Sequence, residues 1–159
     1  MKKNILTLAS LFLFGITSFS QEKNGTIYIK HPNIDAVNKS IETYLHKDAD
    51  ANAKFYSDTA KFWVSGMEKP IGIKEAIPMF MSDFDYYDSI QLKPNGYPDY
   101  LEYDKDHSKV VQSWWTWSGK SKKTGELVKI PVAQFDDFNK DGKIVFESLY
   151  GDFSKMKKD

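Results

Sequence analysis

The chain has 159 residues, with 22 basic and 22 acidic side chains, a formal net charge of zero and no cysteine. Every basic residue is a lysine. Without arginine, the chain cannot make the bidentate guanidinium contacts by which many proteins bind phosphates. Together with the neutral net charge, this argues against a nucleic acid as partner. Without cysteine, neither a disulfide nor a lipid-modified cysteine is available, so a hydrophobic core must supply the stability. Aromatic residues make up 15% of the chain, enough to bury large areas or to line a cavity.

The first 20 residues have the pattern of a secretory signal peptide. Two lysines follow Met1, residues 5–16 are mainly apolar, and Ser18 and Ser20 stand where signal peptidase requires small residues. The apolar run is shorter than the roughly 20 residues of a membrane-spanning helix, although an uncleaved anchor is the alternative. We expect cleavage near Ser20 and a secreted or periplasmic product without a stable membrane anchor. Because two lysines and no acid are removed, the mature net charge is −2.

Three helices are predicted in the first half of the mature chain. Residues 21–33 read as a flexible lead-in, in which residues 26–29 could add an edge strand. After Asn33, a fair N-cap, apolar residues recur every three or four positions. Pro78 falls inside the last helical pattern and predicts a kink or a late helix start there. The predicted helices cover residues 34–45, 48–56 and 73–84.

The rest of the chain is typical of strands separated by turns. A short strand is expected at residues 60–64, and turn sequences such as Pro94-Asn95-Gly96 divide the last seventy residues. Helices first and long hairpins afterwards predict an α+β domain with an antiparallel sheet. A polar tail is expected at residues 154–159. The later strands are predicted near residues 89–93, 99–104, 108–119, 126–138 and 143–153.

The segment from Asp137 to Ser148 resembles the start of a calcium-binding EF-hand loop. Position 12, which should be a glutamate, is Ser148, and Glu147 lies one place early. The flanking residues alternate with strand periodicity, so a hairpin whose turn is Asp141-Gly142 is favoured over a metal site.

Several short motifs, in this order, resemble those of the nuclear transport factor 2-like superfamily, in particular its SnoaL-like branch. The motifs lie at residues 56–63, 70–77, 124–128, 141–144 and 150–152. The resemblance covers residues 34–153. It implies a cone-shaped curved antiparallel sheet wrapped around N-terminal helices, with one apolar pocket inside. Relatives include isomerases, dehydratases and cyclases as well as proteins without catalysis, so the fold does not decide the function. Relatives also pair through the outer sheet face, which makes a homodimer an expectation.

The candidate catalytic residue is Asp136. On the strand at residues 126–138, the alternation that contains Gln134 and Asp136 is the more apolar one, so we expect it to face inward. A carboxyl on an apolar wall has a raised pKa and can act as a general acid or base, with Gln134 as the orienting donor. The alternative is that both side chains lie at a solvated rim.

Further pocket residues are expected from the aromatic content and the family likeness. Trp114 faces opposite to Trp115 and Trp117, and plain packing is the alternative interpretation for each tryptophan. The family likeness favours an inward Ser148 and Tyr150, although one residue of register would reverse the final strand. The predicted ligand-pocket residues are Tyr56, Trp63, Met79, Trp115, Gln134, Asp136, Ser148 and Tyr150.

No metal site, cofactor site or nucleotide loop is predicted, because the three histidines are separated and no glycine-rich phosphate loop is present. Three functions remain open, of which the first is the binding of a small hydrophobic or aromatic molecule. The second is a metal-independent isomerase, dehydratase or cyclase with a pocket carboxylate, in which Tyr56 and Tyr150 would help Gln134 to stabilise an oxyanion. The third is an inactive homodimeric interaction protein.

Overall fold

The computed structural model describes residues 22–156. The predicted signal peptide at residues 1–20 and the last residues of the predicted tail, 157–159, lie outside this range. Helices in the described chain are α2 (Pro32–Leu45), α3 (Ala49–Ala53), α4 (Ile73–Met81), α5 (Asp83–Tyr86) and the short 3-10 helix η1 (Phe153–Lys155). Strands are β1 (Thr26–Tyr28), β2 (Tyr56–Val64), β3 (Ile71–Gly72), β4 (Tyr87–Pro94), β5 (Asp99–Glu102), β6 (Lys109–Ser121), β7 (Leu127–Phe138) and β8 (Ile144–Tyr150). No helix within residues 22–156 is both long and apolar enough to cross a membrane.

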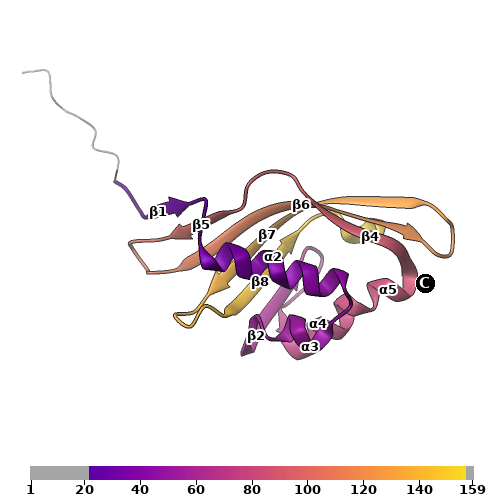
Figure 1. Cartoon of the computed structure of the whole chain (residues 1–159), viewed down its shortest axis with the longest axis horizontal. Coiled ribbons are helices and arrows are strands. Elements are labelled where there is room, and N and C mark those ends of the chain that lie inside the picture. Colours follow the sequence, from indigo (N-terminus) through magenta and orange to yellow (C-terminus); the bar gives the residue numbers. More distant parts are fainter. Residues whose placement is uncertain (1–21, 157–159) are drawn as a thin grey trace, which may run out of the picture.

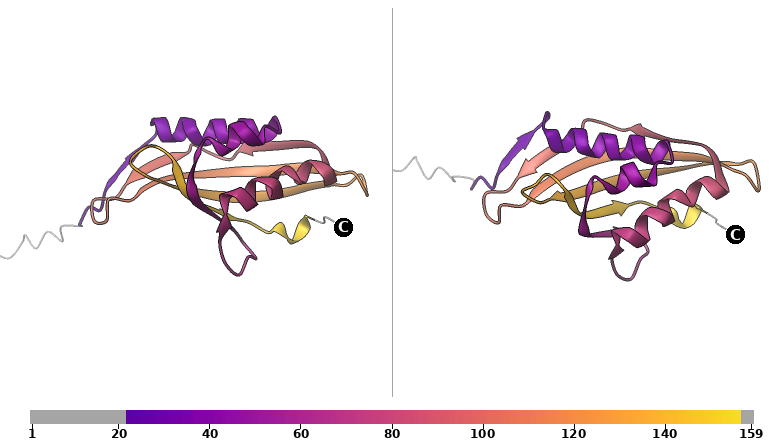
Figure 2. Two further views of the ribbon diagram at one scale, coloured as in Figure 1. Left: turned by 90° about the horizontal axis from the view of Figure 1, so that it is seen from below. Right: turned by 60° about the horizontal axis from the view of Figure 1, so that its bottom comes forward.

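The eight strands form one curved sheet in the order β1-β5-β6-β7-β8-β2-β3, and β4 pairs with the far half of β6 beside β5. Figure 1 shows the long strands β6 and β7 running the length of the molecule, with α2 lying across them. The turned views in Figure 2 show α2, α3 and α4 gathered around one concave side. The predicted α+β fold with a curved sheet around N-terminal helices is therefore confirmed. One pairing differs from the prediction, because β2 runs parallel to β8 and the sheet is mixed.

Helix α2 begins two residues earlier than predicted. His31, not Asn33, is its N-cap, and the His31 Nδ1 atom accepts a hydrogen bond of 3.1 Å from the Asn33 backbone N–H. Pro32 then occupies the first turn, where its missing N–H is not needed. The His31 ring also stacks on Tyr100 with 3.5 Å between ring centroids, which attaches the start of α2 to strand β5. Within the lead-in, residues 26–28 form the edge strand β1.

Two other element boundaries differ from the prediction. Helix α3 ends at Ala53, and Tyr56 is the first residue of β2, where helix was expected up to residue 56. Helix α4 passes through Pro78, ends at Met81 and is followed by the separate short helix α5. The predicted late helix start at Pro78 is wrong, because α4 begins at Ile73 and contains Pro78 as an internal residue.

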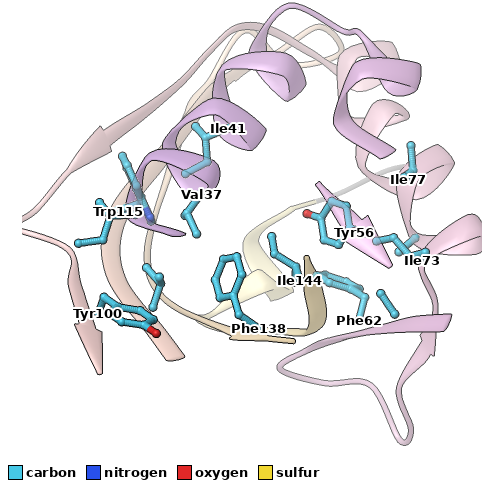
Figure 3. Close-up of a cluster of buried hydrophobic side chains, with 14 residues drawn as sticks. Val37, Ile41, Tyr56, Phe62, Ile73, Ile77, Tyr100, Trp115, Phe138 and Ile144 are labelled. Carbon is cyan, nitrogen blue, oxygen red and sulfur yellow. The ribbon is translucent and has the colours of Figure 1, made fainter. Parts of the chain in front are cut away.

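The apolar core fills the space between the helices and the concave face of the sheet. Val37 from α2, Ile73 from α4 and Phe138 from β7 are buried in the same cluster as Ile144 (Figure 3). Ile144 is fully buried, and its backbone N–H donates to the Phe55 carbonyl at 2.9 Å. This contact attaches the start of β8 to the end of the α3 region and so closes the narrow end of the fold.

The hairpin between β7 and β8 is confirmed at the EF-hand-like segment. The Asn139 side-chain oxygen accepts hydrogen bonds from the backbone N–H groups of Asp141 at 2.9 Å and Lys143 at 3.0 Å. Gly142 has a φ of 71°, the left-handed conformation that glycine adopts without strain. The polar groups of the segment therefore bond to its own backbone and hold a turn.

Ile144 gives a direct test of this core. We expect Ile144→Ala to lower the free energy of unfolding by about 2–5 kcal/mol, because it opens a cavity in a fully buried site. The matched control is Ile27→Ala on edge strand β1, where the side chain is 64% exposed and the change should stay within about 0.5 kcal/mol. Urea unfolding of both variants measures this, and equal losses would contradict the assignment of the core.

Candidate functional site

A cavity of about 100 Å³ lies between the helices and the inner face of the sheet. Most of its wall is apolar, supplied by side chains such as Leu92, Val132 and Leu149 together with the rings of Trp115 and Trp117. Phe153 and Met156, which lie in and after η1, close one side. Part of the segment predicted to be a polar tail is thus packed against the domain. The cavity also has several buried polar groups in its wall, described next.

Glu147 is the acidic residue at the inner end of the cavity. It comes from β8, is 5% exposed and accepts a short hydrogen bond from the Tyr56 hydroxyl of β2. Burial raises the pKa of Glu147 to about 7, against the opposing effect of the hydrogen bond from Tyr56. The pKa of Tyr56 is raised in turn, first by burial and then by the negative charges of Glu147 and Asp136. Tyr56 therefore stays a proton donor, and Glu147 can change its charge near neutral pH.

Asp136 lies directly opposite Glu147 across the antiparallel β7–β8 pairing. It is completely buried, and its Oδ2 atom accepts a hydrogen bond of 2.9 Å from the Gln134 side-chain nitrogen. Its Oδ1 atom has no hydrogen-bond partner among the described residues. Burial first, and then the charge of Glu147, raise the pKa of Asp136 well above its usual range. Two carboxyls this close and this buried keep at least one proton between them at neutral pH.

A second polar group lies at the α2–α5 side of the cavity. The Tyr44 hydroxyl donates to Asp83 Oδ2 at 2.9 Å, and the Trp117 indole nitrogen donates to the Tyr44 oxygen at 3.2 Å. All three residues line the cavity. Burial and the neighbouring Asp83 charge raise the pKa of Tyr44, so this hydroxyl also keeps its proton.

Asn52 from α3 adds an unpaired acceptor to the cavity wall. It is 3% exposed, and its side-chain nitrogen donates to the Ser40 carbonyl at 2.8 Å and to Thr43 Oγ1 at 3.1 Å. Because a backbone carbonyl can only accept, the nitrogen must face Ser40, which fixes the orientation of the amide. The Asn52 Oδ1 atom has no partner among the described residues.

The structure brings half of the predicted pocket residues together. Tyr56, Trp115 and Gln134 line the cavity, and Asp136 lies just behind Gln134. The inward face predicted for strand β7 is confirmed, because Ile130, Gln134, Asp136 and Phe138 are all buried there. The alternative of a solvated rim for Gln134 and Asp136 is wrong.

The other predicted pocket residues lie elsewhere. Met79 packs against the core cluster from α4 and does not line the cavity. Trp63 lies on the outer face, because its neighbour Phe62 takes the inward position and is 1% exposed. Ser148 pairs with the outward Phe135.

Tyr150, also expected inside, lies on the outer face and is 50% exposed. The cause is a bulge at Val145: Phe138 pairs with Ile144, whereas Asp137 already pairs with Phe146. The extra residue shifts the alternation, so Ile144 and Glu147 both point inward and the residues that follow take the opposite faces. The inward Ser148 and Tyr150 of the prediction are thus wrong.

Glu147 was missed as a site residue for the same reason. The sequence places Glu147 on the same face as Leu149 but leaves open which face of the final strand points inward, and the family likeness favoured the other face. Tyr44 belongs to the apolar stripe of the helix predicted at residues 34–45. Ser40 and Asn52 carry no local signal, because they reach the cavity only through the packing of α2 and α3 on the sheet.

An aromatic cluster occupies the outer sheet face instead. The Tyr150 ring lies 5.2 Å from Trp63 and 5.6 Å from Phe135, centroid to centroid. The predicted homodimer would use this face and stays a prediction. Within residues 22–156, no group of three histidine or acidic side chains is arranged to hold a metal ion.

Comparison with known proteins supports the fold. No family model matches the chain, and no curated protein matches it. Among solved structures, AusH from Aspergillus nidulans superposes with a TM-score of 0.62 at 12% identity, over 77% of this chain and 86% of that one. An NTF2-like protein of unknown function from Exiguobacterium sp. 255-15 gives a TM-score of 0.58 at 19% identity, over 74% and 98% of the two chains. A SnoaL-like protein from Shewanella denitrificans OS-217 gives 0.58 at 12% identity, over 80% and 95%.

These similarities show that the chain has the NTF2-like fold, shared with SnoaL-like proteins. The predicted resemblance is therefore confirmed at the level of the fold. At such low identities the comparisons carry no residue-level information, so the chemistry must be argued from this cavity.

The buried acids predict an unusual dependence of stability on pH. Native Glu147 keeps its proton up to about pH 7, whereas unfolded glutamic acid loses it near 4.5. The native state then binds more protons across this interval, so the free energy of unfolding should fall by ~3 kcal/mol as the pH rises from about 4.5 to about 7. Asp136 acts in the same direction. Urea unfolding at several pH values tests this.

The matched variant for this measurement is Glu147→Gln, which keeps an acceptor for the Tyr56 hydroxyl but cannot titrate. Its free energy of unfolding should fall less across the same interval. A wild-type stability that rises between pH 4.5 and 7 would contradict the buried, protonated state of the acids.

Proposed function

We propose that the protein is an exported domain that binds one small, mainly apolar molecule in the cavity between α2 and the sheet. The observation that carries this proposal is the composition of the cavity: apolar and aromatic walls with a few convergent polar side chains, the usual arrangement of a small-molecule site. Its volume of about 100 Å³ limits the enclosed part of the ligand to about one small ring, since a cavity of ~150 Å³ accepts benzene.

The two buried tryptophans are the natural reporters of such binding. Trp115 and Trp117 both line the cavity and are 7% and 6% exposed. Their indole N–H groups already donate, to Ser113 at 2.8 Å and to Tyr44 at 3.2 Å respectively. The rings are thus held in place and offer their faces to a ligand, which supports a binding site that is formed before the ligand arrives.

A screen of small cyclic compounds tests the proposal. Benzene, cyclopentanone and cyclopentanol should include a compound that changes tryptophan fluorescence and raises the melting temperature, with a gain of about 2.7 kcal/mol at 100 times its Kd. Val132→Phe should abolish the effect because the larger ring fills the cavity. Lys129→Phe is the matched control, since it adds the same ring on the exposed face of the same strand. A screen without any response would contradict the proposal.

The second candidate function is proton transfer without a metal. It is favoured by one observation: a carboxyl whose pKa is raised to about 7, at Glu147, lines the cavity beside the protonated Tyr56 hydroxyl. A general base works best when its pKa lies near the working pH, and a phenol can stabilise a developing oxyanion. Asp136, the catalytic residue expected from the sequence, does not line the cavity and would act here as a positioning residue opposite Glu147 on the neighbouring strand.

Hydrogen–deuterium exchange tests this second function without a known substrate. Glu147 would take an α-proton from cyclopentanone, and the Tyr56 hydroxyl would turn from Glu147 to donate to the enolate oxygen. Exchange of the Glu147 proton with D₂O, and return of a deuteron to the α-carbon, would label the ketone. NMR should show enzyme-dependent labelling that falls by about 10²–10⁴ in Glu147→Gln. The control Glu126→Gln alters an exposed acid between β6 and β7 and should label at the wild-type rate. Equal labelling by Glu147→Gln and wild type would eliminate the role of Glu147.

A further inference from the structure

Most hydrogen-bond donors of the cavity wall are already engaged. The Tyr44 hydroxyl donates to Asp83 and the Tyr56 hydroxyl donates to Glu147. The Ser40 hydroxyl donates to the Val37 carbonyl at 2.8 Å. The indole of Trp117 and the amide nitrogen of Asn52 are likewise engaged. A ligand that needed donors from these groups would have to break existing hydrogen bonds, which costs free energy in a buried site.

The acceptors of the wall, by contrast, are in surplus. Asn52 Oδ1 has no hydrogen-bond partner among the described residues although the side chain is 97% buried. A carboxylate can accept up to four hydrogen bonds, so the single bond from Tyr56 leaves Glu147 with spare capacity. Buried unpaired acceptors are rare and are best satisfied by a ligand that brings its own donors.

The charged side chains of the cavity wall also favour a ligand that donates hydrogen bonds. The described residues that line the cavity include two acids, Asp83 and Glu147, and no lysine, arginine or histidine. The faces of Trp115, Trp117 and Tyr56 complete the wall, and aromatic faces attract cations. Among residues 22–156, the side chains that line the cavity would present an anionic ligand with these two carboxyls and no positive charge.

We propose that the cavity selects small ammonium compounds, protonated amines with an apolar body, over neutral alcohols and carboxylates of the same shape. This inference rests on the proposed binding function and names the class of its ligand. The ammonium group lies at the inner end of the cavity, where its N–H groups donate to Glu147 and to Asn52 Oδ1. The apolar body packs against the tryptophan faces and Val132.

Three probes of one shape test the selection: cyclopentylamine, cyclopentanol and cyclopentanecarboxylate. Titration calorimetry with the mature domain at pH 7.5 should give an affinity for the amine about tenfold or more above that for the alcohol, and no detectable binding of the carboxylate. Glu147→Gln should lower the ratio of amine affinity to alcohol affinity to about one, because glutamine keeps the shape and loses the charge. Glu126→Gln, at an exposed acid far along the β6–β7 turn, should keep the wild-type preference.

Asp83→Asn provides a second variant from another element, in case Glu147→Gln does not fold. It should weaken amine binding by a larger factor than alcohol binding. Equal or tighter binding of the alcohol or the carboxylate would overturn the inference while the proposed binding function stands. Failure of all three probes would overturn the inference too, and the cyclic-compound screen above would then decide the binding function separately.

A pH series adds an independent readout. An ammonium ion favours the charged form of Glu147, so amine binding should release protons and strengthen between pH 6 and 8, where an aliphatic amine stays protonated. The groups that face Glu147 are Tyr56 from β2 and Asp136 from β7, with Tyr44 and Asp83 across the cavity. Amine affinity that weakens over this range would contradict the inference.

Discussion

The cavity wall is built around one constraint: two carboxyls, Asp136 and Glu147, lie opposite each other on adjacent strands inside an apolar shell. Ionising both would cost far more than a domain of this size can spare, because buried like charges repel and neither is solvated. The protein meets this constraint with protons and hydrogen bonds: Tyr56 donates to one acid and Gln134 to the other. The acid pair therefore keeps at least one proton at neutral pH, at a place where the rest of the cavity wall is apolar. Any chemistry proposed for this site must start from that protonation state.

The bulge at Val145 is what makes this arrangement possible. Upstream of it, Ile144 points inward and completes the core with Phe138. Downstream, the shifted alternation turns Glu147 inward and Tyr150 outward. One extra residue thus lets a single short strand supply both a core anchor and a site acid, a recurrent use of bulges near functional sites. It also turns Tyr150 to the outer face, where its ring packs against those of Trp63 and Phe135.

How far the sequence could predict this molecule follows from the range of each interaction. Apolar periodicity and turn chemistry are local, so the helices, the long hairpins and the inward face of β7 could be predicted, and so could Gln134 and Asp136 within it. The parallel pairing of β2 with β8 joins residues about 90 positions apart and leaves no local pattern. The bulge also leaves no recognisable sequence pattern, because the strand alternation on either side of it looks normal. Predicting that Glu147 points into the cavity required knowledge of that one-residue shift in register.

The buried polar groups of the cavity that lack hydrogen-bond partners lower the stability of the domain but could serve to bind a ligand. Buried polar groups stabilise a fold only when all their partners are present, and a buried acceptor without a partner costs free energy. The fold nevertheless keeps Asn52 Oδ1 and Asp136 Oδ1 without partners in the described chain. Local features that oppose stability are expected at functional sites. A ligand that donates hydrogen bonds would complete the same polar set that the protein alone leaves incomplete, so its binding should stabilise the domain through the groups that now strain it.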